Sequence, residues 1–200
     1  LRAVCVGKAG RATYDNILTL SYTDQTGYPY RLWLPDEKRL LPVDYNDKSG
    51  YKRLTLMDGL RLKADLGGWK LSSVTSVQML FDSMNMDQDF TPKSIFTLNQ
   101  TQKQFAATQE IILRPSVRPD WWDSQTGVFL MAKFNRMSAP VDFLEGGIKS
   151  LILDNANSGI PADFGRLDIL EDRFRIASDF DILTGNLAAY HESVFSLGRW

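Results

Sequence analysis

Few side chains in this sequence have the types and spacing that acid–base or nucleophilic chemistry requires. His191 is the only histidine and Cys5 the only cysteine among 200 residues. A lone histidine excludes HExxH and other two-histidine metal sites, and it weighs against Ser–His–Asp and Cys–His nucleophiles. The single cysteine excludes an intrachain disulfide, a CxxC pair and a cysteine-rich zinc site. We therefore expect no catalytic residue and no metal site, and in particular none built on His191 or Cys5.

Motifs that hold phosphate groups or activate a serine are also absent. The sequence contains neither GxGxxG nor GxxxxGK[ST], and it lacks GxSxG. The tetrapeptide SGYK, Ser49–Lys52, has the spacing of a Ser-x-x-Lys pair. Such a pair acts from the first turn of a helix, whereas this one lies in a turn that enters a predicted strand. We interpret Ser49 as a turn residue and expect no cofactor.

Carboxylates are concentrated toward the C-terminal part of the sequence. The six are Asp163, Asp168, Glu171, Asp172, Asp179 and Asp181. Two or three of them could hold Mg²⁺ or Ca²⁺, and a facing pair could hydrolyse a glycoside. However, Arg166, Arg173 and Arg175 alternate with them, which favours ion pairs between neighbouring strands on a solvated face. We favour the ion pairs and keep glycoside chemistry as the alternative.

The segment RPSVRPDWWDSQTG, residues 114–127, combines prolines, arginines and adjacent tryptophans. Its two prolines disfavour a helix or a central strand, so the segment is predicted to be a loop. Successive side chains of an extended chain point apart, and one indole is therefore expected to remain near the surface. Tryptophan and arginine are common anchors of interfaces. We predict that this loop binds a partner through Trp121, Trp122, Arg118 and Arg114.

Turn residues recur between the segments that must position these side chains. The closest copies are DQTGY at Asp24–Tyr28, DKSGY at Asp47–Tyr51 and DSQTGV at Asp123–Val128. In such a sequence the Asp side chain caps backbone N–H groups, and the glycine adopts a positive φ. The pattern predicts turns at Asp24–Gly27, Asp47–Gly50 and Ser124–Gly127. It also predicts positive φ at Gly27 and Gly50.

Apolar and polar side chains alternate on both sides of these turns, which is typical of strands. The predicted strands are Ile17–Tyr22, Tyr28–Leu34, 54–62 with a turn or bulge at Asp58-Gly59, Val128–Phe134 and 174–182. A helix is predicted over 141–152, although Gly146 and Gly147 would cost it about 2 kcal/mol. The segments Trp69–Phe81 and Gln102–Leu113 fit a strand or a helix.

The composition is that of a folded globular chain, with 44% hydrophobic and 24% charged residues and a net charge of −1. The absence of a basic block excludes nucleic acid as an expected partner. Because no apolar run approaches roughly 18 residues, we expect no membrane span. The first residue is Leu1, without a signal-peptide pattern, which suggests a trimmed chain. We predict one β-rich domain over residues 1–200, an antiparallel sandwich or barrel built from hairpins with one or two short helices.

These observations favour an interaction protein over an enzyme. We expect a structural subunit of a larger assembly, of the capsid, tail, fibre or pilus type, that self-associates through complementary surfaces. Its expected location is a virion or an extracellular assembly. The alternative is a carbohydrate-binding module or glycan-active hydrolase, in which Trp121 and Trp122 would stack on sugar rings beside the carboxylates of Asp163–Asp181.

Overall fold

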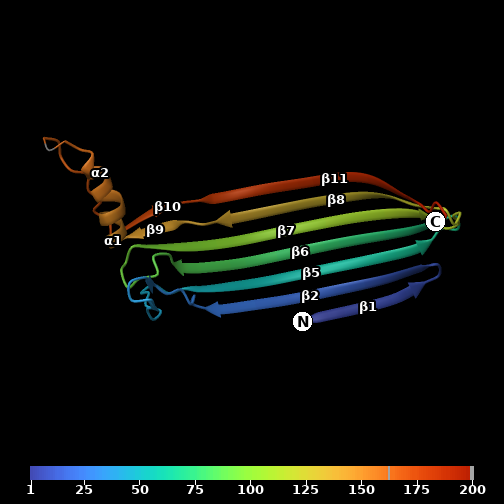
Figure 1. Cartoon of the computed structure of the whole chain (residues 1–200), viewed down its shortest axis with the longest axis horizontal. Coiled ribbons are helices and arrows are strands. Elements are labelled where there is room, and N and C mark those ends of the chain that lie inside the picture. Colours follow the sequence, from blue (N-terminus) through green and yellow to red (C-terminus); the bar gives the residue numbers. More distant parts are fainter. Residues whose placement is uncertain (162, 199–200) are drawn as a thin grey trace.

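Alternation of apolar and polar residues continues far enough to build strands of 15 to 20 residues. The computed structural model describes residues 1–161 and 163–198. Its main element is a nine-stranded antiparallel sheet in which seven strands follow the order β1-β2-β5-β6-β7-β8-β11 (Figure 1). These strands are β1 (Arg2–Ala9), β2 (Ala12–Thr26), β5 (Gly50–Asp65), β6 (Trp69–Asp87), β7 (Phe96–Pro115), β8 (Trp122–Ser138) and β11 (Asp179–Phe195). The mainly β, hairpin-built fold class with short helices is confirmed.

Short elements lie beyond one end of the long strands. β9 (Val141–Leu144) pairs with β7 and with β10 (Arg173–Ile176). β3 (Trp33–Leu34) and β4 (Arg39–Leu40) form a separate two-stranded sheet between β2 and β5. The helical segment consists of α1 (Glu145–Gly147), the π-helical η1 (Ile148–Leu153) and α2 (Asp154–Ser158), and it projects away from the sheet (Figure 1).

The predicted helix over 141–152 begins later than expected, because its first residues pair as β9. The two glycines that follow allow the helical segment to lie against the connection between β6 and β7. A Cβ on Gly146 would lie 2.8 Å from the carbonyl oxygen of Ser94, and a Cβ on Gly147 would overlap the carbonyl oxygen of Ile95. The glycines are therefore required for close approach of two backbones.

The turn predictions have mixed outcomes. Gly27 has a φ of 72°, as predicted, but the turn predicted at Asp24–Gly27 is not formed, since Asp24 to Thr26 are the last residues of β2. Gly50 has no positive φ because it is already the first residue of β5. The turn predicted at Ser124–Gly127 is wrong, since these residues lie inside β8 and pair in continuous register with β11. Asp58-Gly59 is likewise continuous strand within β5. Of Tyr28–Leu34, only the last two residues form a strand.

The connections between the long strands differ in length at the two ends of the sheet. Three short connections, residues 10–11, 66–68 and 116–121, lie at what we call the turn end. Three longer connections, residues 27–49, 88–95 and 139–178, lie at the opposite, loop end. The C-terminal end of β11 reaches the turn end (Figure 1).

The strand register assigns every side chain to one of two faces. On one face a single row of apolar side chains crosses six strands, each residue paired with the next: Leu20, Leu56, Met79, Phe105, Phe134 and Leu183. All six are exposed. Among the described residues, Ile148 is the only buried hydrophobic side chain. The described chain is therefore a single layer whose apolar face lacks a cover.

Candidate interaction surface

The largest chemically uniform surface is this apolar face of the sheet. Four further rows follow the first toward the turn end, and they contain mostly Leu, Val, Ile and Ala. Their best-exposed apolar members are Leu62, Ile111, Val128, Leu130 and Leu187. In the described strands, Asp58 is the only charged side chain on this face between the row of Leu20 and the end of the sheet at Trp122. We call these five rows, which span Phe105–Leu113 on β7, the apolar band.

Polar side chains inside the apolar band bond to one another. Asn16 Nδ2 donates to Asp58 Oδ1 at 2.9 Å across β2 and β5. Gln109 accepts from Thr75 Oγ1 at 2.6 Å and donates to Ser73 Oγ at 2.8 Å across β6 and β7. These five side chains therefore have partners without water, which reduces the cost of covering them.

Charged side chains form a boundary of the apolar band at the loop end. Lys103, Arg136 and Asp181 are paired neighbours on β7, β8 and β11. Arg136 Nε and Nη2 donate to the two carboxylate oxygens of Asp181 at 2.7 and 2.8 Å. This hydrogen bonding lowers the pKa of Asp181 below its usual value. On β2 and β5 the same boundary continues as the Lys52–Asp24 ion pair, at 3.5 Å.

Aromatic side chains form the boundary at the turn end. Trp122 and Phe195 are paired residues on β8 and β11, and their rings stack with a centroid separation of 6.5 Å. The ring of Trp121 joins this stack at 6.3 Å from each of the other two. Trp69 lies on the same face and is 52% exposed. We call Trp121, Trp122 and Phe195 the aromatic cluster.

The structure separates the four predicted partner-binding residues. Trp121 and Trp122 share the aromatic cluster, rather than pointing apart, because Trp121 precedes β8 and strand alternation does not apply to it. Trp121 is 55% exposed, whereas Trp122 is half-buried and donates from Nε1 to Ser193 Oγ at 3.1 Å. Arg118 forms an ion pair with Asp123. Arg114 lies on the opposite face of the sheet, where its Nε donates to Gln125.

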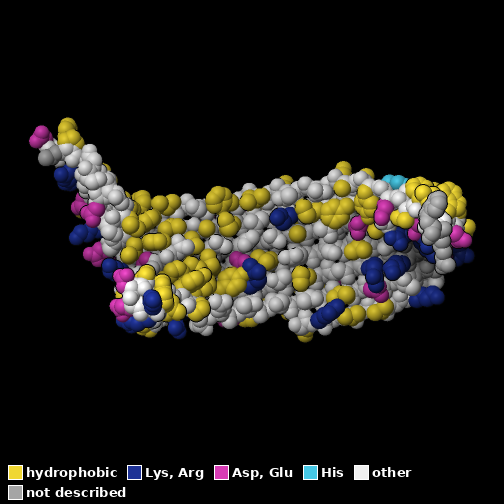
Figure 2. Space-filling model, in the orientation of Figure 1, with side chains coloured by type: hydrophobic (Ala, Val, Ile, Leu, Met, Phe, Trp, Pro, Cys, Tyr) yellow, Lys and Arg dark blue, Asp and Glu magenta, His cyan; other side chains and the backbone are white. Residues whose placement is uncertain are grey.

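The opposite face, which we call the polar face, exposes some apolar side chains such as Ile182, but it carries charge along its length. Arg61 bonds to Asp15, and Arg53 Nη2 lies 3.0 Å from the buried Asp82. Figure 2 shows a face on which Lys, Arg, Asp and Glu side chains lie among apolar ones, between the two ends as well as at them. Such a face can remain in water.

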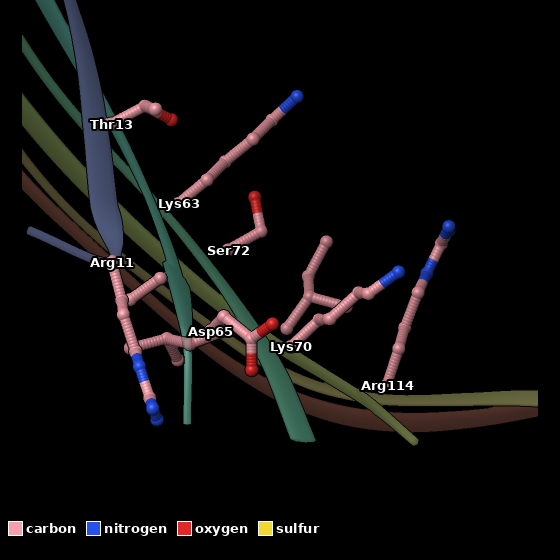
Figure 3. A pocket seen from close by; sticks show the side chains of 10 residues that line it. Arg11, Thr13, Lys63, Asp65, Lys70, Ser72 and Arg114 are labelled. Carbon is pink, nitrogen blue, oxygen red and sulfur yellow. The ribbon is translucent and has the colours of Figure 1, made fainter. Parts of the chain in front are cut away.

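At the turn end the polar face contains a cationic cleft with a volume of about 440 Å³. Its charged lining residues are Arg11, Lys63, Asp65, Lys70 and Arg114. Figure 3 shows Lys63, Lys70 and Arg114 extending to the same side of the strands. The single carboxylate, on Asp65, accepts the backbone N–H of Gly67 at 2.8 Å. The cleft has the charge to attract an anion, but its lining is open and contains flexible lysines.

The acidic residues and the tryptophans lie at opposite ends of the sheet. Asp179 and Asp181 begin β11 at the loop end, whereas the aromatic cluster lies where β11 ends. Along β11, Asp181 and Phe195 are separated by roughly 45–50 Å at about 3.4 Å per residue. The tryptophans and carboxylates proposed for a glycan-active hydrolase therefore do not lie in one site. Asp163 and Asp168 lie in the connection between α2 and β10.

Two cross-strand ion pairs involve residues of the acidic segment, but neither joins one of its six carboxylates to Arg166, Arg173 or Arg175. Arg136–Asp181 forms one of them. In the other, Arg175 Nε and Nη2 donate to Asp142 Oδ1 and Oδ2 at 2.7 and 2.9 Å across β10 and β9. Asp142 is fully buried and also accepts from Asn99 at 3.3 Å. The hydrogen bonds from Arg175 hold the pKa of Asp142 below its usual value despite burial.

The side chains with nucleophilic or metal-binding potential are dispersed. His191 lies between Thr126 and Ser193, with ring nitrogens 2.8 and 2.9 Å from the two hydroxyl oxygens. Cys5 is exposed on the edge strand β1. Ser49 is buried, and its Oγ accepts the backbone N–H of Asp87 at 2.9 Å. Within residues 1–161 and 163–198, no three His, Cys, Asp or Glu side chains are placed to share a metal ion.

The comparisons with known proteins add no functional information. No protein-family model, curated protein sequence or solved structure matches the chain. In the described part of the chain, no helix is long and apolar enough to cross a membrane. The interpretation of this surface therefore depends on its geometry and chemistry alone.

Sequence reasoning missed the apolar band. The signal was present in alternating apolar residues over 54–62, 105–113 and 128–134. The runs over 54–62 and 128–134 are each predicted separately as strands, and the run over 105–113 fits a strand or a helix. Only the register shows that these runs share one face and that the described chain places nothing over it.

Proposed function

We propose that the chain is a structural or interaction subunit of a larger assembly and that it works by surface complementarity. The observation that carries this proposal is the exposed row of apolar side chains from Leu20 to Leu183, which crosses six strands. Monomeric soluble proteins rarely expose contiguous apolar patches larger than a few hundred Å². The capsid, tail, fibre and pilus types all remain candidate forms of the assembly.

The size of the apolar band is that of an interface. Six strands at a spacing of about 4.8 Å span roughly 25 Å, and Phe105–Leu113 extends about 27 Å along β7. The resulting area of nearly 700 Å², measured flat, is close to the roughly 800 Å² per partner of a standard protein interface. Covering the band would therefore contribute enough apolar burial to hold an assembly together.

The two edge strands provide a second route to self-association. β1 pairs only with β2, and β11 pairs only with β8, among the described strands. β11 is 17 residues long, so its outer edge presents a long series of free backbone donors and acceptors. Strand addition from another copy would satisfy these groups and extend the sheet.

Disulfide trapping tests the edge pairing. Cys5 is the only cysteine and its side chain lies on the apolar face at the edge strand β1. In a continuous sheet, Ala189→Cys on β11 faces the same side as Cys5, whereas the neighbouring Ala188→Cys faces the other side. We expect oxidation to link Ala189→Cys subunits into covalent oligomers, and the Ala188→Cys control to remain largely monomeric. Since the register between copies is unknown, Leu187→Cys and Gly185→Cys extend the scan on the same face.

The mass of the native particle provides the decisive measurement. We expect oligomers whose population rises with protein concentration and without any added ligand. A particle that stays monomeric at all concentrations, with no disulfide-linked oligomer in the scan, would contradict the proposal. A monomer whose tryptophan fluorescence shifts with added oligosaccharide would support the glycan-binding alternative instead.

A further inference from the structure

We propose that the apolar band contacts the hydrocarbon of a lipid bilayer. This inference rests on the proposed function for the strand partners of β1 and β11, and it assigns lipid, in place of a second subunit, to the apolar band. It is drawn from the dimensions of the band, the pairing of its polar groups, the nature of its two boundaries and the contrast with the opposite face.

The length of the apolar band fits a bilayer. Phe105–Leu113 spans about 27 Å when fully extended, and the hydrocarbon core of a typical bilayer is about 30 Å thick. On β5, the matching residues from Leu56 to Ala64 have the same length. A strand needs about 9–11 residues to traverse this thickness when tilted, and the long strands exceed that length. The excess carries the polar boundary rows into the headgroup region.

Most polar side chains inside the apolar band meet the rule that hydrocarbon imposes. An unpaired polar group in hydrocarbon costs several kcal/mol. The Asn16–Asp58 and Gln109–Thr75 hydrogen bonds provide partners from the chain itself. Asp58 is the band's single charged side chain, and it is the acceptor in the first of these bonds. Backbone groups of the inner strands are paired along the full register.

The two boundaries of the apolar band resemble the two interfaces of a bilayer. Amphipathic aromatic rings are enriched at the level of the lipid headgroups. Trp69 and the aromatic cluster lie at the turn end, and Tyr22 lies at the loop end in the row next to the band. The charged side chains Lys103, Arg136 and Asp181 occupy that same loop-end row. An ordinary protein partner would not require this order of aromatic, apolar and charged zones.

At the same positions along the strands, the polar face carries charged side chains. Arg61 lies on the polar face of β5, between the band residues Leu60 and Leu62, and bonds to Asp15. Glu110 lies on the polar face of β7 and accepts the Tyr190 hydroxyl at 2.8 Å. A second bilayer-facing surface is therefore excluded, and water or protein covers this side. The outer edges of β1 and β11 also need strand partners in hydrocarbon, which the proposed self-association supplies.

A matched pair of labels tests which face contacts lipid. In a Cys5→Ser background, Leu130→Cys places a thiol in the apolar band, and Met131→Cys places one on the polar face of the same strand. Each variant, labelled with an environment-sensitive fluorophore, is reconstituted into phosphatidylcholine vesicles with or without lipids that carry a nitroxide on the acyl chain. Leu183→Cys and Thr184→Cys repeat the comparison on β11, in case either substitution on β8 prevents folding.

We expect the nitroxide lipids to quench the labels at 130 and 183 about two-fold or more, while those at 131 and 184 change little, because adjacent residues face opposite sides. Equal quenching of both faces, or a label at 130 in water, would overturn the inference. A dry but unquenched label at 130 in a dimeric particle would also overturn it, since a second copy would then cover the band. That last result would leave the proposed function intact, whereas quenching at 130 in a strictly monomeric particle would contradict the proposed function alone.

Discussion

The ring of Tyr190 on β11 lies across Gly127 on β8, where a Cβ would overlap the ring and its hydroxyl oxygen. The tyrosine hydroxyl continues over β8 and donates to Glu110 Oε1 on β7 at 2.8 Å. This hydrogen bond is the main cause of the raised pKa of Tyr190. One side chain therefore connects three adjacent strands, and the glycine between them is what permits it.

Gly127→Ala should lower the free energy of unfolding by about 1–3 kcal/mol, because the added methyl group must displace the tyrosine ring. Gly185→Ala on β11 is the matched control, since a Cβ there meets no atom within 4 Å. Denaturant unfolding of both variants measures the difference. Equal effects at the two positions would show that the ring does not depend on the glycine.

The Arg175–Asp142 pair predicts a pH-dependent contribution to stability. The pKa of Asp142 is lower in the folded chain than its usual value, chiefly through the hydrogen bonds from Arg175. The contribution is therefore complete above the unfolded pKa of about 3.9 and is lost as the pH falls through the lower, folded pKa. Asp142→Asn should cost about 1–3 kcal/mol near neutral pH. It should also remove part of the acid dependence seen when unfolding is measured from pH 6 to pH 2.

The adjacent tryptophans should respond differently to truncation. Trp121→Ala should leave the chain folded and weaken its association, because that ring is more than half exposed. Trp122→Ala should lower stability by roughly 1–3 kcal/mol, since it removes a half-buried ring and its bond to Ser193. Circular dichroism and particle mass measured on the same samples distinguish the two effects. If both variants unfold, the aromatic cluster is structural; if neither has an effect, the partner contact lies elsewhere.

Gly147→Ala should disturb the helical segment selectively. The new methyl group would overlap the carbonyl oxygen of Ile95, so α1 and η1 should move away from the connection between β6 and β7. Amide hydrogen exchange should accelerate over residues 145–158 and remain slow in β6 and β7. Gly165→Ala, where a Cβ meets no atom within 4 Å, is the control. Unchanged exchange in the Gly147 variant would show that the segment tolerates the overlap.

The alternation of apolar and polar residues predicted the fold class correctly, whereas the turn motifs predicted the positions of the turns less well. The strands around 17–22 and 128–134 were correct because apolar side chains recur at every second residue along one face of each. The turn at Ser124–Gly127 was wrong because the glycine serves a different purpose: it accommodates Tyr190 from a strand far away in sequence. A sequence motif cannot distinguish a glycine required by φ from one required by a neighbouring ring.

The candidate surface was harder to predict than the strands. Trp121 and Trp122 were recognised, but their joint stack with Phe195 depends on a pairing across 73 positions of sequence. The criterion of a long apolar run tests helices alone. In strands each apolar residue is followed by a polar one, so a surface of comparable size never produces such a run. It becomes visible only when the register aligns the alternating residues of neighbouring strands.

The meander order has a consequence for how the chain reaches its native state. Each long strand pairs with the long strand that precedes it in the sequence, from β1 through β11. The sheet can therefore grow by adding one strand at a time to the last one formed, without waiting for a distant segment. The longest interruption, residues 139–178, falls before the final strand. Closing that loop comes late, so β11 should be the last long strand to dock and the first to detach.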